Sequence, residues 1–311
     1  MKIEHKKLLR KFLVLFLVLL VTYFFDNTID NINLTDNKNV ELKQVDNQIN
    51  ETIDGNANFK IYYLDVGEAD SILIENSGEY ALIDAGNNED GKNLVEFFNT
   101  LGITNFKYVI GTHGHEDHIG GMDNIIKNFN IEHFYMPDVL VNNKTFEEII
   151  DNLDKKGIEY ETPLIDSTFT MAESKFTVLY IGDDKEDLNM DSIILKLNYK
   201  NTSYLFTGDA PTDAERGILN KDLKSDVLKV GHHGSRYSTS ANFLKKVYPK
   251  YAIISVGKDN DYGHPHNVIL DKLNRIGSKV YRTDTDGTIL LTSDGENINI
   301  ETIDTNTNGG D

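Results

Sequence analysis

Cysteine is absent from the 311-residue chain. Its absence excludes disulfide bonds, thiolate metal ligands and a lipid-modified N-terminal cysteine. Basic residues are scarce too: 31 Lys and Arg stand against 50 Asp and Glu, which gives a formal net charge of −19. Because binding to a phosphate backbone normally depends on Lys and Arg, this balance argues against a broad nucleic-acid-binding surface. Bound metal ions would still supply positive charge locally.

The N-terminal segment contains an apolar run from Phe12 to Phe25 that only Thr22 interrupts, and five basic residues precede it. This order is typical of an export signal. The run is short for a full membrane span, and no cleavage site of the small-x-small type follows it. We therefore favour an anchor that holds the protein at the extracellular face of the membrane. A cleaved signal, which would release a secreted protein, is the alternative.

Composition divides the chain into four parts. We predict a signal or membrane anchor at 1–25, a disordered linker at 26–58, one folded domain at 59–304 and a flexible tail at 305–311. The folded part is long enough for one large core. The sequence does not indicate an oligomeric state.

The folded part alternates strands and helices. Strands are expected at 60–64, 71–74, 80–83, 106–110, 134–136, 176–181, 192–197, 203–206, 227–230, 251–256, 279–282, 288–292 and 298–303, and helices at 92–101, 122–129, 145–156, 213–219, 241–247 and 268–276. Two blocks of strands, each punctuated by helices, predict an α+β fold of the αββα sandwich type. In such a fold two mixed β-sheets pack face to face and helices cover the outer faces.

The loop after the strand at 106–110 carries the pattern H-x-H-x-D-H, formed by His113, His115, Asp117 and His118. Imidazole and carboxylate groups are ligands for Zn²⁺ or Mn²⁺. In an extended stretch His113 and His115 point the same way and can hold one ion, and the chain then turns so that Asp117 and His118 can face a second. Two such ions polarise a substrate oxygen and generate hydroxide at neutral pH. A histidine-rich loop that binds no metal is the alternative.

Several other strands also end in a polar residue, as at Asp84, Asp209 and His232. Loops at the carboxyl ends of strands are where α/β proteins carry their chemistry. A single Asp in that position is often only a turn residue. The recurrence favours one shared site.

These residues resemble the metallo-β-lactamase superfamily of hydrolases, and the match covers nearly all of 59–303. Within that superfamily the chain is most similar to the hydrolase domain of ComEC-type competence channels and its stand-alone relatives. The segments that carry the resemblance are 64–71, 112–121, 205–210, 227–240 and 261–266. The resemblance implies a metallo-β-lactamase-like fold and two divalent metal ions, Zn²⁺ or Mn²⁺.

The resemblance also implies roles for particular residues. His113 and His115 would hold the first ion, Asp117 and His118 the second, and Asp209 would bridge both. One of His232 and His233 would complete the second site; we favour His233, which leaves His232 to contact substrate. Asp84 would form hydrogen bonds behind the histidines. The candidate catalytic residues are Asp117, His232 and His264, and for His264 the roles of general acid, ligand and loop constraint remain open.

One feature of the superfamily is missing: the additional histidine on the first ion, expected between the metal loop and Asp209. Only His133 lies in that interval, in a strand-like context. Water or Asp191 would fill the gap, and a more oxygen-rich site favours Mn²⁺.

The predicted function is that of an exported binuclear hydrolase, most consistent with a phosphodiesterase that uses a metal-bound hydroxide. The resemblance suggests a nuclease, whereas the negative charge favours a small or cell-wall-linked phosphodiester, such as phosphorylcholine on teichoic acid, or another ester. A non-catalytic or nuclease-accessory role in DNA uptake at the cell surface is the alternative.

Overall fold

The structure of the chain, a computed structural model, describes residues 58–138, 143–184 and 186–303. The predicted membrane anchor, the tail and all but the last residue of the predicted linker lie outside these ranges. Within them, no helix combines the length and the apolar character that crossing a membrane requires.

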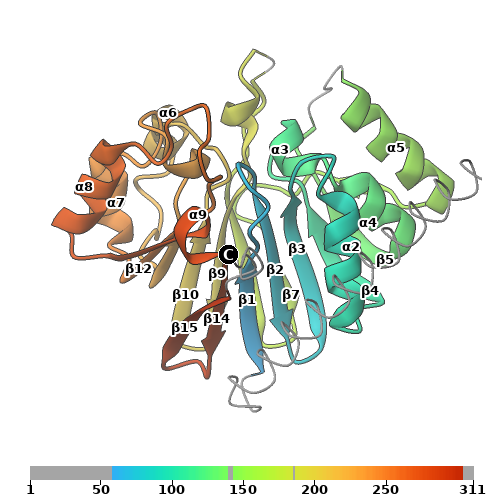
Figure 1. The fold of residues 1–311 in the computed structure, drawn as a ribbon, viewed down its shortest axis with the longest axis horizontal. Coiled ribbons are helices and arrows are strands. Elements are labelled where there is room, and N and C mark those ends of the chain that lie inside the picture. Colours follow the sequence, from blue (N-terminus) through green and yellow to red (C-terminus); the bar gives the residue numbers. More distant parts are fainter. Residues whose placement is uncertain (1–57, 139–142, 185, 304–311) are drawn as a thin grey trace, which may run out of the picture. The chain divides into compact units, whose positions relative to one another are not determined.

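Two β-sheets form the centre of the domain (Figure 1). The strands of the first sheet are, in spatial order, β15 (Ile298–Ile303), β14 (Thr288–Ser293), β1 (Phe59–Tyr63), β2 (Ser71–Asn76), β3 (Glu79–Ala85), β4 (Asn105–Ile110), β5 (Asn130–Tyr135) and β6 (Tyr160–Glu161). Those of the second are β13 (Lys279–Arg282), β12 (Tyr251–Ile254), β11 (Val227–Lys229), β10 (Thr202–Phe206), β9 (Ile194–Tyr199), β8 (Ser174–Tyr180) and β7 (Thr168–Met171). Both sheets are mixed: β3 to β6 and β10 to β13 run parallel, and the remaining neighbours pair antiparallel.

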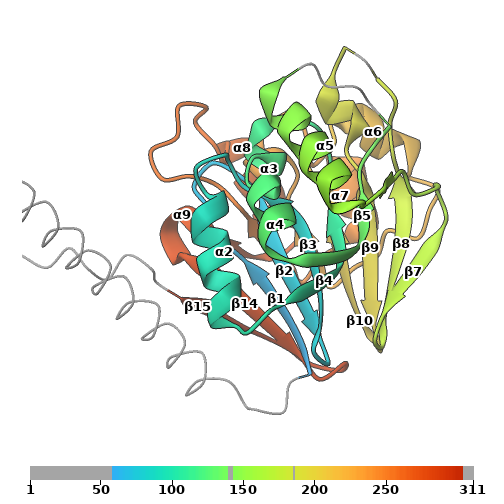
Figure 2. The same cartoon turned by 90° about the vertical axis from the view of Figure 1, so that its right-hand side faces the viewer.

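Helices cover the outer faces of both sheets. The first sheet is flanked by α2 (Gly91–Thr100), α3 (Glu116–Ile119), α4 (Met122–Asn128) and α5 (Lys144–Lys156), which face the viewer in Figure 2. The second is flanked by α6 (Thr212–Gly217), α7 (Ala241–Val247) and α8 (Asn267–Arg275), on the left of Figure 1. A short helix, α9 (Thr283–Asp286), follows β13. The predicted αββα sandwich is confirmed.

The main core lies between the sheets. Phe59, Ile61 and Tyr63 of β1 face it, and the Phe59 ring stacks on Tyr199 of β9 with centroids 4.4 Å apart. Tyr62, between them in sequence, points the other way and packs edge-on against Phe97 of α2. Because both faces of the central strands are covered, these strands read as nearly continuous apolar runs.

The elements that the sequence did not predict are short. They are β6, β7, α3, α9 and two 3₁₀ helices at Leu188–Asp191 and His232–Gly234, each of two to four residues. Such pieces are too brief to show a period of two or of 3.6. β5 begins at Asn130, four residues before the predicted start at 134. Its first four residues are half-buried or exposed and only Ile131 among them is apolar, so the sequence gives little sign of a strand there.

A buried ion pair joins the two sheets beneath the polar loops. The Lys229 ammonium, on β11, lies 2.6 Å from Oδ2 of Asp70, which immediately precedes β2, and the two residues are 0% and 1% exposed. Asp70 also donates its N–H to the carbonyl of Asp117 and accepts from the N–H of Gly86. Asp70 therefore connects the second sheet to two loops of the first.

Removing one partner of a buried pair leaves an uncompensated charge. We expect Lys229→Met to lower the free energy of unfolding by about 3–5 kcal/mol, measured by urea denaturation of the full chain. The double variant Lys229→Met/Asp70→Leu should lose less than Lys229→Met alone, because no charge remains buried. Lys221→Met, which removes a cation whose partner Asp166 is exposed, is the control and should cost at most about 1 kcal/mol. Equal losses for Lys229→Met and Lys221→Met would contradict the prediction.

Candidate metal centre

Asp117, His118, Asp209 and His233 form the centre of the site. Each offers one ligand atom, and these four atoms all lie within 4.8 Å of one another. Asp117 and His118 lie on α3, Asp209 follows β10, and His233 lies in the 3₁₀ turn η2 (His232–Gly234) after β11. Nε2 of His118 is 3.3 Å from Oδ1 of Asp209, and Nε2 of His233 is 3.2 Å from Oδ2 of Asp117. Residues far apart in sequence are thus brought together at one end of the two sheets.

Both histidines of this cluster present Nε2 to its centre. Nδ1 of His233 lies 3.0 Å from the carbonyl oxygen of Ser255, which can only accept, so Nδ1 carries the proton. Nδ1 of His118 lies 2.8 Å from Oδ2 of Asp84. A hydrogen bond of this kind behind a ring orients it and leaves the other nitrogen free to bind a metal.

Asp84 lies behind the cluster and contacts the metal loop. Besides His118 it accepts hydrogen bonds from the N–H and the hydroxyl of Thr112, at 2.8 and 2.7 Å. Asp84 is fully buried, and its backbone is left-handed, with φ 59°. Such a conformation is costly for a residue other than glycine and persists where surrounding contacts demand it. Here the contacts are those that hold the metal loop.

His113 and His115 meet beside the cluster. Nε2 of His113 lies 3.0 Å from Nδ1 of His115, and the ring of His113 lies 4.1 Å from that of His118 between centroids. His113 is fully buried, whereas His115 lines the pocket. Two imidazole nitrogens therefore converge next to the four-residue group, as the alternation of side chains in an extended segment predicts.

The electrostatics of the cluster favour a cation. Burial by itself would raise the pKa of the Asp209 carboxyl, but His118 and His233 lower it well below its usual range. Burial would lower the pKa of His118, yet the Asp209 and Asp84 carboxylates raise it well above its usual value. Against burial, Asp209 and the hydrogen bond with Asp117 raise the pKa of His233 to about 9. The carboxylates thus hold positive charge at the centre.

Unpartnered buried atoms test whether a metal fits. In the part of the chain that the structure describes, Nε2 of His118 and Oδ1 of Asp209 are both buried and neither has a hydrogen-bond partner. Buried polar atoms are rarely left so. A divalent cation between them would satisfy both, and the donor set of imidazole and carboxylate suits Zn²⁺ or Mn²⁺.

The turn that carries the paired histidines separates their roles. His232, His233 and Gly234 are successively left-handed, with φ of 53°, 51° and 83°. This backbone directs His233 into the cluster and leaves His232 at the pocket, with Nε2 3.6 Å from Oδ2 of Asp209. The four-residue group contains His233 and does not contain His232.

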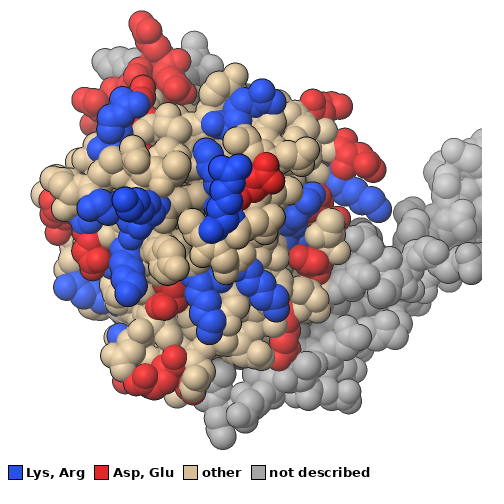
Figure 3. Space-filling model, turned by 90° about the vertical axis from the view of Figure 1, so that its left-hand side faces the viewer, with Lys and Arg blue, Asp and Glu red and all other residues tan. Residues whose placement is uncertain are grey.

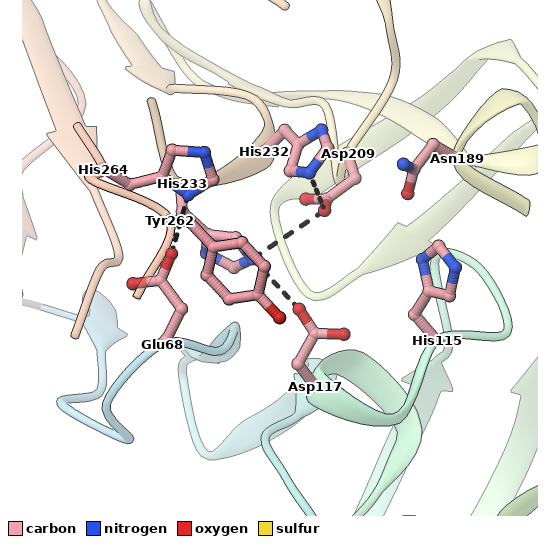
Figure 4. Close-up of a pocket in the computed structure, with 9 residues that line it drawn as sticks. All are labelled: Glu68, His115, Asp117, Asn189, Asp209, His232, His233, Tyr262 and His264. Carbon is pink, nitrogen blue, oxygen red and sulfur yellow. Dashed lines mark hydrogen bonds and ion pairs between the residues drawn. The ribbon is translucent and has the colours of Figure 1, made fainter. Parts of the chain in front are cut away.

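A pocket of about 240 Å³ opens over the cluster (Figure 4). His264 lines it, with Nδ1 2.7 Å from Oε1 of Glu68. Asn260 accepts from the His264 N–H and donates to its carbonyl, and the ring of Tyr262 stacks on that of His264. His264 is therefore held by three neighbours beside the group of four.

Some residues of the site were not predicted. Glu68, Asp70 and Tyr262 lie within the segments that carry the family resemblance, but no local pattern indicated what they contact. Asn189 lines the pocket, whereas the expected Asp191 does not line it; its Oδ1 accepts a hydrogen bond from the Asp184 N–H at 2.6 Å. His133 is half-exposed, stacks on Tyr108 and lies away from the pocket.

Two packed sheets with a His/Asp cluster at one end of their strands are the architecture of a metal-dependent hydrolase. The chain belongs to the metallo-beta-lactamase superfamily, whose family model matches residues 64–258. Among solved structures, the metallo-beta-lactamase fold protein YhfI from Bacillus subtilis superposes with a TM-score of 0.52 at 12% identity, covering 72% of this chain and 96% of that one.

Curated relatives are considerably longer than this chain. ComE operon protein 3 of Bacillus subtilis is 34% identical over 64% of this chain and 26% of its own length. Recombination protein 2 of Haemophilus influenzae is 29% identical over 73% and 28%, and competence protein ComA of Neisseria gonorrhoeae 27% identical over 72% and 31%. The matched region thus spans about a quarter to a third of each relative. These homologies confirm the predicted similarity to competence proteins.

Asp209 should matter more to metal binding than any single histidine. Asp209→Asn keeps the shape of the side chain but removes the charge that His118, His232 and His233 face. We expect it to weaken total metal binding by more than the roughly 10–100-fold that the loss of an outer partner costs, whereas His113→Ala should affect mainly one ion. Elemental analysis after Zn²⁺ or Mn²⁺ loading, with circular dichroism to monitor the fold, measures this. Asp213→Asn, on the exposed face of α6, is the matched control, and parent-like metal content in Asp209→Asn would refute the assignment.

Proposed function

We propose that the chain is a binuclear metal-dependent phosphodiesterase. The observation that carries the proposal is the position of Asp209: Oδ1 faces His118 at 3.3 Å, and Oδ2 faces His232 and His233 at 3.6 and 3.7 Å. With the His113–His115 pair alongside, this arrangement supports two ligand sets that share one carboxylate. Two divalent ions, Zn²⁺ or Mn²⁺, supply Lewis-acid chemistry there by lowering the pKa of water and neutralising charge on the reacting phosphate.

The side chains around the pocket have separate tasks in this proposal. His264 is the proton donor for the leaving oxygen: Glu68 accepts from its Nδ1–H, and the imidazolium form of the ring carries a second proton on Nε2 that can pass to the substrate. His232, which also lines the pocket, contacts the substrate phosphate. Asp117 binds through Oδ2 to His233, and its partly exposed carboxylate can also orient a water molecule. Glu68 acts through His264 and is a positioning residue.

The pocket admits only part of a large substrate. Its volume of about 240 Å³ lies below the roughly 300–1,000 Å³ that is typical of pockets for small-molecule ligands. That is room for ions and one phosphodiester group. A polymeric substrate would therefore have to continue over the surface outside the pocket.

The distribution of charge favours a nucleic-acid strand as a second, more specific candidate substrate. Between Arg236 and Arg282 the chain has nine Lys and Arg against three Asp, although its net charge is −19. Exposed members of this basic face lie on α7, α8 and β13, namely Lys245, Lys246, Arg275 and Lys279. Figure 3 looks onto this face and shows Lys and Arg gathered over it. The scarcity of basic residues in the whole chain conceals this local excess.

An aromatic ring at the pocket supports the same candidate. Tyr262 lines the pocket and is 69% exposed. Exposed aromatic rings beside a basic surface are the usual stacking platforms for the bases of single strands. A teichoic-acid phosphodiester has no base to stack, so this feature favours a nucleic acid over a cell-wall polymer.

Two further proposals concern the setting of the enzyme. The apolar run at 12–25 supports a location outside the membrane, where the protein is either tethered by this segment or released by its cleavage. Protease treatment of intact cells and the mass of the mature chain would distinguish these two cases.

One relative is named a competence protein, which supports a role in DNA uptake. A non-catalytic role there is the alternative, but the convergence of Asp117, His118, Asp209 and His233 favours catalysis.

Hydrolysis should depend on metal and, for natural leaving groups, on His264. We expect the full chain to hydrolyse bis(p-nitrophenyl) phosphate, to lose this activity with chelator and to regain it with Mn²⁺ or Zn²⁺. Nitrophenolate leaves without a proton, whereas the alkoxide of a dinucleotide needs one. His264→Gln should therefore reduce kcat by about 10²–10⁴-fold for the dinucleotide and much less for the nitrophenyl ester. His133→Gln is the control. A metal-loaded parent that hydrolyses neither substrate would support the non-catalytic alternative.

Binding of a strand should depend on the basic face. The variant Lys245→Gln/Lys246→Gln/Arg275→Gln should raise KM for a single-stranded oligonucleotide and leave turnover of the nitrophenyl ester unchanged. Each lost phosphate contact reduces the slope of log K against log salt by about 0.7 for single strands. The control variant, Lys127→Gln/Lys144→Gln/Lys155→Gln, removes three exposed cations from α4 and α5 on the other flank. Equal effects of both variants would argue for small substrates.

A further inference from the structure

The first metal position, at His113 and His115, has fewer charged neighbours than the second. Nε2 of His113 and Nδ1 of His115 converge at 3.0 Å. Neither residue belongs to the group of Asp117, His118, Asp209 and His233. Even with a shared Asp209 carboxylate, the first ion would have two imidazoles and no further ligand among the residues that the family resemblance assigns to it. A polar atom that faces the His115 side of the pocket would complete it.

Asn189 provides such an atom. It lies in the short 3₁₀ helix η1 (Leu188–Asp191) between β8 and β9, and it lines the pocket with His115. In Figure 4 the side chain of Asn189 is drawn above the ring of His115, and the amide oxygen of Asn189 is on the side that faces this ring. Within the described residues, Oδ1 of Asn189 is buried and has no hydrogen-bond partner. Leaving such an atom unsatisfied costs about 1–3 kcal/mol, so a ligand for it is expected.

The backbone around Asn189 is tied to both metal-bearing loops. The N–H of Ile193 donates to the carbonyl of Thr112, directly before His113, at 2.9 Å. The hydroxyl of Ser192 accepts from the N–H of Asp209 at 3.2 Å. The N–H of Asn189 itself donates to Asp187. The segment is therefore held between the two loops, and the position of the amide is set by the same contacts that set Asp209 and the metal loop.

Asp191, the carboxylate expected to fill this gap, is used differently. Its Oδ1 accepts from the Asp184 N–H, and the residue does not line the pocket. In a 3₁₀ helix, residues two apart point to different sides. When Asn189 faces the pocket, Asp191 faces Asp184.

We propose that Oδ1 of Asn189 is a further protein ligand of the first ion, beside His113, His115 and the shared Asp209 carboxylate. This inference rests on the binuclear site of the proposed function. An amide oxygen is a harder ligand than the imidazole it replaces and carries no charge. The first site should therefore bind its ion more weakly than the second and should accept Mn²⁺ more readily than an all-imidazole site would.

The test is a metal titration of the full chain after chelator treatment. Equilibrium dialysis with elemental analysis gives the stoichiometry and affinity for each ion, and electron paramagnetic resonance reports free and paired Mn²⁺. We expect Asn189→Ala to bind one ion with the parent's affinity and the other at least about tenfold more weakly, the lower end of what outer partners cost. The signal of the coupled Mn²⁺ pair should disappear. Asn189→His should restore the second equivalent and shift the preference of that site toward Zn²⁺.

Two variants control the experiment. Asn198→Ala removes a partly buried amide on β9 that does not line the pocket and should bind both ions like the parent. Asp191→Asn tests the rival ligand. If Asp191→Asn loses the first ion and Asn189→Ala does not, the carboxylate is the ligand and the proposal fails. It also fails if Asn189→Ala, folded by circular dichroism, keeps two ions at parent affinity. A parent that binds no metal would instead refute the binuclear site itself.

Discussion

The buried contact between Asp70 and Lys229 is the constraint on which the site depends. The metal ligands come from loops of two different sheets, and each sheet could shift relative to the other by sliding across an apolar core. Dispersion forces in such a core are not directional. An ion pair at 2.6 Å, fully removed from water, is directional. Because Asp70 also bonds to the backbone of Asp117 and Gly86, the register between the sheets is transmitted to the loops that carry the ligands. We infer that the pair serves geometry more than stability, since buried ion pairs contribute little net stability.

A second level of order lies in the hydrogen bonds behind the histidines. Nδ1 of His118 is hydrogen-bonded to Asp84, and Nδ1 of His233 is hydrogen-bonded to the carbonyl of Ser255. Asp84 lies near the end of β3 in the first sheet, and Ser255 directly follows β12 in the second. The rings cannot rotate without breaking these bonds, so their Nε2 atoms converge before any cation is present. The result is a preorganised site, and preorganisation is what makes a charged centre effective in catalysis.

The sequence predicted the sandwich because its central strands and flanking helices are long enough to show their periods. It predicted the metal loop because His113 to His118 are neighbours in the chain. It did not predict the contacts of Glu68 with His264 or of Asp70 with Lys229, since these partners are separated by 196 and 159 residues. Nor did it separate Asn189 from Asp191: the two lie in one short segment, and only the 3₁₀ geometry decides which of them faces the pocket. Contacts of high sequence separation leave no local pattern.

The charge count explains why a neutral side chain suits the position of Asn189. Asp117 and Asp209 would bring two negative charges to two divalent ions, and the histidines and the amide bring none. The loaded centre would then keep an excess of two positive charges before hydroxide binds, which would attract the proposed anionic phosphodiester and would stabilise the additional charge that develops as it reacts. A carboxylate in place of Asn189 would remove half of that excess. The basic face on α7 and α8 extends the same attraction beyond the pocket, while the acidic remainder of the surface repels polyanions. For the proposed anionic substrate, this distribution of charge would favour approach at one place, because most of the surface is unfavourable.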